Sequence, residues 1–327
     1  MVALDRFDRR LNAGSGPDGP DSPDTVYSCK RYALLHQNRI LEMMAHVPRR
    51  IVRESIRVID LVQLFLINRL GRRPVTEHGG PVVSLTTHGK RSQKVYYAIE
   101  SIARGNVRPS RLILWIDDEA LLKNLPATIR RLQKRGLEVK PCRNYGPHTK
   151  YYPYVESNET FNTPLVTADD DILYPRYLLK KLIEANREYP DTVNCYTAFW
   201  VDVGKKGIGK YKDWIPWGST RPYFRNFALG VMGVIYPPAF LTVLKRAGTT
   251  FEDSCPKGDD LWLHVQALRS GYRVRQIFPR LPYFSFQEIP GTQKTNLRRD
   301  NIDHGDGNDR QIAATYNEAD VQLLRSD

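Results

Sequence analysis

The 327-residue chain has few cysteines, and none of them lie at metal-binding spacing. Cys29, Cys142, Cys195 and Cys255 are widely separated, which argues against a structural zinc site and against a disulfide-stapled scaffold. No apolar run reaches the length of a membrane span, and the first residues lack the pattern of a secretory signal. From these absences we expect a cytoplasmic protein in a reducing environment.

Signatures of nucleic-acid recognition are also absent, since no helix-turn-helix, RNA-recognition or zinc-finger pattern occurs in the sequence. The formal net charge is nevertheless +13. A basic surface attracts nucleic acid, anionic lipid or phosphorylated ligands, and charge by itself does not choose among them. Residues 30–75 hold ten Lys and Arg against three acidic residues, so more than half of the net charge lies in this one region.

Changes in composition divide the chain into four segments. Residues 1–28 are rich in Gly, Pro and Asp and poor in apolar residues, so we expect them to be disordered. Residues 29–78 form a basic extension with apolar residues at helical spacing. Residues 79–286 alternate between strand and helix patterns and form the main domain. Residues 287–327 are a polar tail, which we expect to be partly disordered.

Two helices are predicted in the basic extension, one over Tyr32–Met44 and one that starts after Pro48 and runs to Leu70. One face of the second helix carries basic residues spaced four apart, which are Arg49, Arg53 and Arg57. Another face carries apolar residues, which are Ile56, Ile59, Val62, Leu66 and Leu70. A basic, apolar helix can lie in a membrane interface, so residues 49–70 are a candidate contact with an anionic membrane surface. The alternative is a helix packed on the main domain with a solvated basic edge.

Strand and helix patterns alternate through the main domain. Strands are predicted at Pro81–Thr87, Arg111–Ile116, Leu137–Pro141, Val193–Phe199 and Tyr272–Phe278, and helices at Ser92–Arg104, Ala120–Lys134, Tyr177–Glu188 and Pro238–Arg246. Residues 200–228 read as a long irregular loop rich in aromatic residues. Repeated strand–helix units predict an α/β fold with a single Rossmann-like, mainly parallel sheet flanked by helices, preceded by the helical extension.

The stretch Pro164–Pro175 contains an apolar run followed by three consecutive acids, Asp169, Asp170 and Asp171. The run predicts a buried strand, and ligands of open α/β sheets bind at the carboxyl ends of their strands. Asp169 and Asp171 are two residues apart and can point the same way from an extended backbone, whereas Asp170 points the other way. Such a pair can hold Mg²⁺ or Mn²⁺ and leave the remaining coordination to phosphates and water. The alternative is a solvated acidic turn.

Further carboxylates lie at the boundaries of two other predicted elements. Asp117 follows the second strand, where it either lines the cleft or caps the next helix. Asp259 and Asp260 follow Gly258 and open a helix at about Leu261. We expect one of these two acids to cap that helix and the other to face the cleft, where it could act as a general base.

Three segments in this order resemble the glycosyltransferases of the A-type fold, the nucleotide-sugar-dependent class that includes the large family 2. The segments are Val82–Thr86 with Ile113–Asp118, then Thr167–Pro175, which matches the Asp-x-Asp metal motif, and Asp260–Val265 with Gly271–Val274, which is similar to the acidic helix near the acceptor. The resemblance covers about residues 80–280. It implies an enzyme that moves a sugar from a nucleotide-diphosphate donor to a glycan or glycolipid acceptor, with Mn²⁺ or Mg²⁺ as cofactor.

The resemblance also implies roles for particular residues. Asp171 would be the direct metal ligand, and Asp169 would reach the metal, its bound water or the ribose. Thr86 and Asp117 would line the nucleotide pocket, and Lys150 would contact a phosphate, although a surface lysine is the ordinary alternative. Asp170 completes the set of nucleotide-sugar-binding candidates.

On the acceptor side, the resemblance favours Asp260 over Asp259 as the general base. Lys257 and Gly258 stand where the family usually places an acidic pair, which leaves open both the base and whether the transfer inverts or retains the anomeric configuration. His304 is a candidate late metal ligand, with a histidine in a flexible tail as the alternative. Trp214 and Trp217 are candidates for stacking on an acceptor sugar, with core packing as the alternative.

Two other functions remain open from the sequence. The charge suggests a nucleic-acid-binding protein or a metal-dependent nuclease, but the basic residues cluster outside the acidic stretch, so we expect no nucleic-acid partner. The fold could also serve as a non-catalytic scaffold on a membrane, but the intact acidic motif argues against that. We therefore expect a cytoplasmic enzyme, with peripheral binding to the inner face of the membrane if residues 49–70 lie on lipid.

Overall fold

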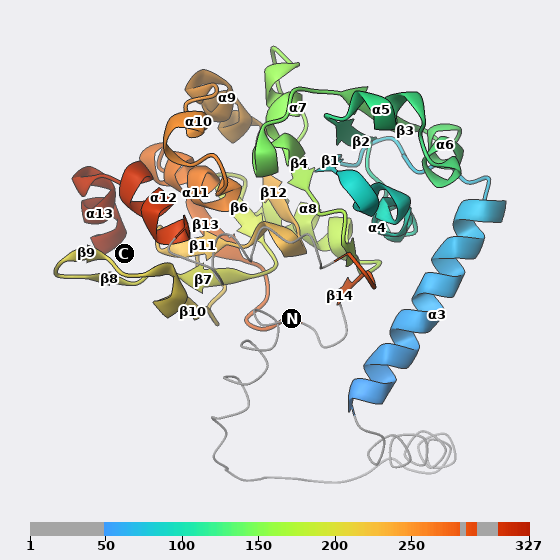
Figure 1. The fold of residues 1–327 in the computed structure, drawn as a ribbon. Coiled ribbons are helices and arrows are strands. Elements are labelled where there is room, and N and C mark those ends of the chain that lie inside the picture. Colours follow the sequence, from blue (N-terminus) through green and yellow to red (C-terminus); the bar gives the residue numbers. More distant parts are fainter. Residues whose placement is uncertain (1–48, 282–285, 293–306) are drawn as a thin grey trace, which may run out of the picture. The chain divides into compact units, whose positions relative to one another are not determined.

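The computed structural model describes residues 49–281, 286–292 and 307–327 (Figure 1). The predictions made for residues 1–28, for Tyr32–Met44 and for His304 lie outside these residues. The chain divides into two units, residues 1–60 and 61–327. Among the described helices, none is both long and apolar enough to cross a membrane.

A seven-stranded sheet forms the centre of the second unit (Figure 1). From edge to edge its strands are β13 (Arg273–Gln276), β6 (Thr192–Cys195), β12 (Val234–Tyr236), β4 (Leu165–Thr167), β1 (Val82–Thr86), β2 (Arg111–Ile116) and β3 (Leu137–Pro141). All neighbours are parallel except β12, which is antiparallel to β4 and β6. The expected mainly parallel central sheet is confirmed.

The register of the sheet brings the ends of β1 and β4 together. Ser84 lies opposite Thr167, and the Ala168 N–H donates to the Ser84 carbonyl at 3.2 Å. Almost every side chain of β1 and β2 is buried, as is expected when both faces of a parallel strand are covered. The residues that follow β1 and β4 therefore meet at one edge of a rigid core.

Helices and short 3-10 turns connect these strands. They are η1 (Gly89–Gln93), α4 (Val95–Ala103), α5 (Glu119–Lys123), α6 (Ala127–Gln133), η2 (Gly146–Lys150), α7 (Tyr152–Glu156), α8 (Leu178–Glu188), α9 (Pro238–Ala247), α10 (Phe251–Ser254) and α11 (Asp259–Arg269). The predicted helix Ala120–Lys134 is in fact two helices. Pro126 separates them, because proline has no N–H to donate and keeps the preceding residue out of the helical conformation.

Several short strands were not predicted from the sequence. The expected strand Val193–Phe199 is divided, since β6 ends at Cys195 and β7 (Ala198–Trp200) belongs to another sheet. That second sheet also contains β10 (Ile215–Pro216) and β11 (Asn226–Ala228), and a hairpin joins β8 (Val203–Gly204) to β9 (Gly207–Ile208). Residues 200–228 therefore contain paired strands, although the sequence reads as an irregular loop.

Part of the polar tail is helical. Helices α12 (Gly307–Thr315) and α13 (Glu318–Arg325) pack against α11, and Ile312 and Leu324 join the core cluster. Arg269 on α11 forms an ion pair with the buried Asp320 at 2.8 Å. The sequence prediction did not include these two helices, because each contributes only a few apolar residues to the core.

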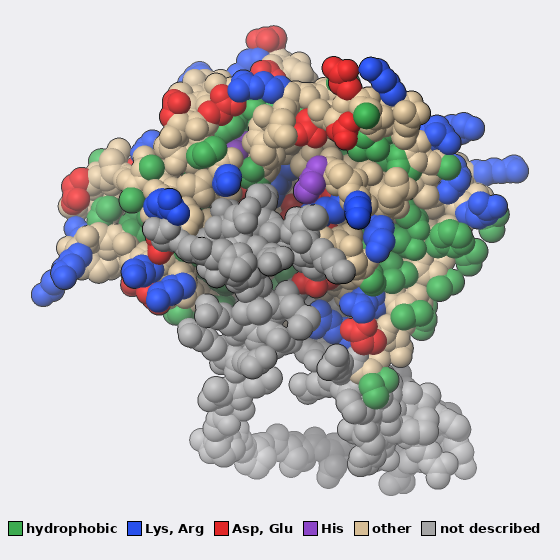
Figure 2. Space-filling view, in the orientation of Figure 1, with side chains coloured by type: hydrophobic (Ala, Val, Ile, Leu, Met, Phe, Trp, Pro, Cys, Tyr) green, Lys and Arg blue, Asp and Glu red, His purple; other side chains and the backbone are tan. Residues whose placement is uncertain are grey.

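The long helix α3 (Arg49–Leu70) carries both buried and exposed apolar side chains. Leu64 is fully buried against Ala98, Leu173 and Ile289, so this part of the helix packs on the domain. Of the nine large apolar side chains exposed among the described residues, seven lie on α3, and Figure 2 shows hydrophobic side chains at the surface over this helix; the seven are Ile51, Val58, Ile59, Val62, Phe65, Leu66 and Leu70. Leu64 thus packs on the domain, and contact of the exposed apolar side chains with a membrane remains a prediction.

Candidate active site

The acidic motif lies at the carboxyl end of β4, beside the loop that follows β1. Asp170 is 4% exposed and accepts hydrogen bonds from the Thr87 hydroxyl at 2.6 Å and from Arg91 at 2.9 Å. A second nitrogen of the Arg91 guanidinium lies 3.1 Å from Asp171. Burial raises the pKa of the Asp170 carboxyl, and the charge of Arg91 opposes that rise. Asp170 is therefore anchored inside the protein, and Asp171 shares its Arg91 partner, whereas Asp169 contacts Lys150.

Asp169 turns the other way and is the most accessible of the three acids, with a quarter of its side chain exposed. Its carboxylate lies 3.0 Å from the ammonium of Lys150. Its backbone N–H donates to the hydroxyl of the buried Tyr174 at 2.7 Å, and that hydroxyl donates to the Val231 carbonyl. The hydrogen bonds of the buried Tyr174 hydroxyl thus fix the loop conformation that presents Asp169.

Lys150 is a largely enclosed cation rather than a surface lysine, since 12% of its side chain is exposed. Its carbonyl accepts a hydrogen bond from the Ser84 hydroxyl at 2.7 Å, and Ser84 in turn accepts one from the Trp115 indole at 2.9 Å. Its ammonium also lies 2.9 Å from Asp259. Burial disfavours the charged ammonium, but the carboxylates of Asp169 and Asp259 outweigh it and raise the pKa of Lys150 well above its ordinary value.

The two acids of α11 lie in its first turn, and neither caps the helix. The N-cap is Gly258, and no side chain accepts from the first turn there, so the expectation that one acid caps the helix was wrong. Asp259 instead pairs with Lys150. Asp260 accepts a hydrogen bond from the Gly230 N–H at 3.1 Å. Burial, together with the charge of Asp259, raises the pKa of Asp260 to about 7.

These residues form one charged network of five carboxylates and two cations. Arg91 contacts Asp170 and Asp171. Lys150 contacts Asp169 and Asp259, and the charge of Asp260 also acts on its ammonium. When all seven groups are ionised, the negative charges exceed the positive ones by three. A surplus of negative charge in a partly buried cluster favours binding of a further cation.

The oxygen donors of this network fit Mg²⁺ or Mn²⁺. Among the described residues, no three His, Cys, Asp or Glu side chains converge on one point that could hold a metal. Mg²⁺ in nucleotide sites usually takes only one or two carboxylates and completes its shell with phosphates and water. The arrangement therefore suits a cation that arrives with a phosphorylated ligand.

The two predicted nucleotide residues lie at the same edge of the sheet. Asp118, not Asp117, caps α5, because its carboxylate accepts from the Leu121 N–H at 3.0 Å. Asp117 makes no hydrogen bond with any residue that the structure describes. Thr86 ends β1 half-buried, and its hydroxyl donates to the Trp115 carbonyl at 3.1 Å. Asp117 is thus available to a ligand at the end of β2.

The two candidate acceptor residues have different surroundings. Trp214 is 4% exposed and packs edge-on against Phe227, so it belongs to the core and does not present a face to a sugar. Trp217 is half-buried and stacks on Trp200, with ring centroids 4.0 Å apart. Arg225 lies over the Trp200 ring at 4.5 Å. At least part of this aromatic surface is therefore already covered by the protein.

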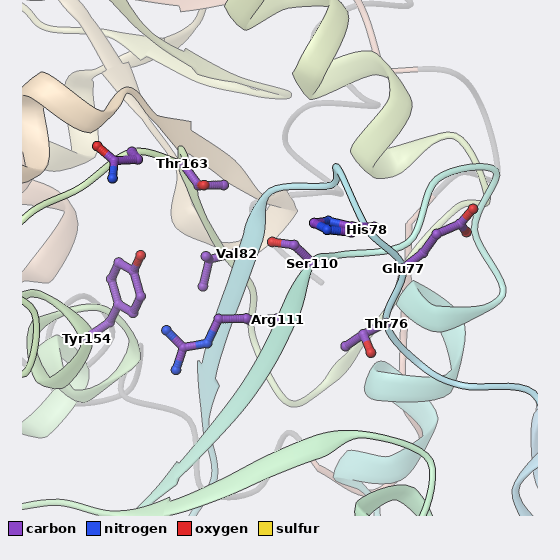
Figure 3. A pocket seen from close by; sticks show the side chains of 9 residues that line it. Thr76, Glu77, His78, Val82, Ser110, Arg111, Tyr154 and Thr163 are labelled. Carbon is purple, nitrogen blue, oxygen red and sulfur yellow. The ribbon is translucent and has the colours of Figure 1, made fainter.

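A separate pocket lies at the amino ends of β1 and β2, away from the acids (Figure 3). Its lining includes His78, Ser110, Arg111 and Tyr154. Arg111 makes a two-pronged ion pair with Glu138, with both contacts at 2.7 Å. Ligands of open α/β sheets bind at the opposite, carboxyl ends, so this pocket is not the donor site.

Sequence reasoning missed Arg91, Thr87 and Gly230. Arg91 and Thr87 lie in the loop after β1, more than seventy residues from the acids that they contact. Gly230 follows β11, a strand that was itself not predicted. The only local signal was that Thr87 ends a predicted strand and Arg91 follows it, where functional residues of α/β proteins gather.

Comparison with known proteins gives likenesses of fold at low sequence identity. No protein-family model and no curated protein sequence matches the chain. Among solved structures, a mannosyltransferase from Pyrobaculum calidifontis, PcManGT in complex with GDP-Man and Mn²⁺, is 11% identical with a TM-score of 0.48, covering 85% of this chain and 80% of its own. TarS 1–349 of S. aureus is 14% identical with a TM-score of 0.42, covering 74% and 68%.

A third structure, GalNAc-T7 with UDP, GalNAc and Mn²⁺, is 10% identical with a TM-score of 0.41, and the match covers 61% of this chain but only 42% of that one. Likenesses at this level concern the fold alone. The activity is therefore inferred from the residues at the carboxyl edge of the sheet.

Proposed function

We propose that the protein is a metal-assisted glycosyltransferase that moves a sugar from a nucleotide-diphosphate donor to a hydroxyl of a glycan or glycolipid acceptor. The observation that carries this proposal is the network at the ends of β1 and β4, in which five carboxylates outnumber two cations. Burial, together with the charge of Asp259, raises the pKa of one of the five, Asp260, to about 7. Such a site can bind a cation with a diphosphate and take up a proton in the same cleft.

On the donor side, Asp169 and Asp171 are the residues that would hold Mn²⁺ or Mg²⁺. The bound cation would offset the negative charge that develops on the departing nucleotide diphosphate. Lys150 can donate to a diphosphate oxygen, because its ammonium is charged and already lies 3.0 Å from Asp169. Asp117 and Thr86, at the ends of β2 and β1, would line the nucleotide pocket. Asp170, with Thr87 and Arg91, holds the motif in place.

On the acceptor side, Asp260 would accept the proton of the attacking hydroxyl. A general base works best when its pKa lies near the working pH, and burial together with the charge of Asp259 raises the pKa of Asp260 to about 7. Asp259 is paired with Lys150, so its role is to position that ammonium. The Gly230 N–H fixes the orientation of the Asp260 carboxylate.

A ligand screen by thermal shift tests the donor and the metal. Nucleotide sugars that bind the folded protein raise its melting temperature by mass action, and we expect the rise to require Mn²⁺ or Mg²⁺ and to vanish in EDTA. Asp171→Asn should remain folded and lose metal-dependent transfer. Wild-type turnover by this variant, or full activity in EDTA, would remove the metal from the proposal.

We also propose that α3 binds an anionic membrane surface, so that the enzyme is peripheral to the membrane. Val62, Phe65, Leu66 and Leu70 are between 45% and 71% exposed on the outer side of the helix, beside the exposed Arg69. An amphipathic helix with apolar and basic residues binds anionic lipid through both buried area and charge.

Vesicle co-sedimentation tests this contact. Wild-type protein should bind vesicles that contain phosphatidylserine, and added salt should weaken the binding. Leu66→Asp should abolish it. The matched control is Gln63→Asp, which adds the same charge at an exposed position of the same helix without removing an apolar side chain. Equal losses in the two variants would show that charge alone matters and that no apolar face enters the lipid.

A further inference from the structure

A single ammonium connects the donor side of the site with the acceptor side. Lys150 lies 3.0 Å from Asp169, which follows β4, and 2.9 Å from Asp259, which opens α11. These two acids are ninety residues apart in the sequence and belong to different elements. Only 12% of the side chain is exposed in both Lys150 and Asp259, so water screens the contact poorly.

The base of the Lys150 side chain is fixed, whereas its charged end can move. The Ser84 hydroxyl donates a 2.7 Å hydrogen bond to the backbone carbonyl of Lys150, and the Trp115 indole N–H donates to the Ser84 hydroxyl. The four-carbon stem that follows lets the ammonium shift between neighbouring acids without any change in the backbone. Because the charges of Asp169, Asp259 and Asp260 all act on this one ammonium, the acids compete for it, and loss of one acid leaves the ammonium to the others.

We propose that Lys150 couples occupancy of the donor site to the two acids of α11. This inference rests on the proposed function. A divalent cation held by Asp169 would compete with the ammonium for the same carboxylate and would repel it. The ammonium would then pair only with the acids of α11, where it contacts Asp259 and stabilises the charged form of Asp260. Lys150 is thus a positioning residue, and the acceptor side becomes organised when the cation enters with the donor.

Such coupling is reciprocal, because the free energy that links two sites is the same from either end. If Asp259 helps to draw the ammonium away from Asp169, removing the charge of Asp259 must return the ammonium to Asp169 and weaken cation binding there. Removing Lys150 must strengthen cation binding, because the competing charge is gone. Once Lys150 is absent, Asp259 can influence the metal only through long-range charge.

A double-mutant cycle of Mn²⁺ affinity, measured by titration calorimetry without any donor, tests this coupling. Lys150→Met should bind Mn²⁺ at least threefold more tightly than wild type, and Asp259→Asn at least threefold more weakly. In the Lys150→Met background, Asp259→Asn should change the affinity less than twofold. Lys150→Arg keeps the charge and should restore wild-type affinity to within about twofold.

Lys94 provides a matched control, because it is also a lysine near this edge of the sheet but contacts the Pro290 carbonyl and not the acids. Lys94→Met should leave Mn²⁺ affinity within twofold of wild type. If Lys150→Met does not fold, Lys150→Gln, whose amide can hydrogen-bond to either acid, replaces it in the cycle. Additive effects of the two substitutions would overturn the coupling. Failure of the wild-type protein to bind Mn²⁺ at all would instead overturn the metal in the proposed function.

Discussion

The backbone N–H of Gly230 donates a 3.1 Å hydrogen bond to Asp260, and the same carboxylate occupies the space that a side chain at residue 230 would need. A Cβ atom at Gly230 would lie 2.6 Å from an Asp260 oxygen and 3.2 Å from the Lys150 nitrogen. Real carbon–oxygen contacts are longer, so glycine at this position allows the carboxylate and the ammonium to approach the backbone.

The first prediction follows from this close approach. Gly230→Ala should displace the Asp260 carboxylate and lower kcat by roughly tenfold to a thousandfold, since a well-placed general base contributes about 10²–10⁴-fold. Donor affinity, measured by titration calorimetry, should change little. The control is Gly204→Ala, where an added Cβ meets no atom within 4 Å. Full activity of the Gly230→Ala variant would show that Asp260 is not the general base.

The second prediction concerns pH. Because Asp260 must be ionised to accept a proton and its pKa is about 7, kcat/KM should fall about tenfold for each pH unit well below 7. Asp260→Asn should be slow at all pH values and should lack this acid limb. A rate that does not change between pH 5 and pH 8 in the wild type would contradict the assignment.

The same shift predicts a third effect, on stability. A carboxyl group whose pKa is higher in the folded state stabilises the fold while it is protonated, and this contribution is lost as pH rises through the folded pKa of about 7. Asp260→Asn stays neutral, so it should melt above the wild type at pH 8 by several degrees, and the difference should shrink towards pH 4. Thermal unfolding at both pH values measures this; a constant difference would mean that the titrating group is not Asp260.

A fourth prediction contrasts two neighbouring acids. Asp170 is 4% exposed and accepts hydrogen bonds from Thr87 and Arg91, so Asp170→Asn should destabilise the fold by about 1–3 kcal/mol. Asp169 has a quarter of its side chain exposed, so Asp169→Asn should cost less than about 1 kcal/mol but weaken Mn²⁺ binding by about tenfold or more. Denaturant unfolding and calorimetry distinguish the two; equal stability of both variants would contradict the structural role of Asp170.

The fifth prediction concerns the tail. Leu324 is fully buried on α13, while its neighbour Leu323 is 37% exposed. Leu324→Ala should therefore destabilise the protein by about 2–5 kcal/mol, and the matched Leu323→Ala by about 0.5 kcal/mol or less. Urea unfolding of the two variants measures the difference. If both substitutions were neutral, the tail helix would not belong to the cooperative core.

Local patterns in the sequence were sufficient for the framework of the fold. The apolar run Val82–Leu85 is long enough to specify a buried strand, whereas the short run Leu165–Thr167 was recognised through the three acids that follow it and mark a ligand edge. Strand β12 could not be inferred, because three apolar residues after Gly233 carry too short a pattern and only pairing with β4 and β6 makes them a strand. Helices α12 and α13 were not predicted for the same reason, because their few apolar residues become a packing face only in contact with α11.

The acids of the site were visible in the sequence, whereas their partners were decided by tertiary structure. Asp169, Asp170 and Asp171 stand together in the chain, so a sequence pattern can find them. Arg91, Lys150 and Asp259 reach them only because β1, β4 and the start of α11 meet at one edge of the sheet. An ion pair between residues far apart in sequence leaves no local pattern, because its cause is the path of the chain. The same holds for the pKa of Asp260, which depends on burial and on the charge of Asp259 that only the folded protein supplies.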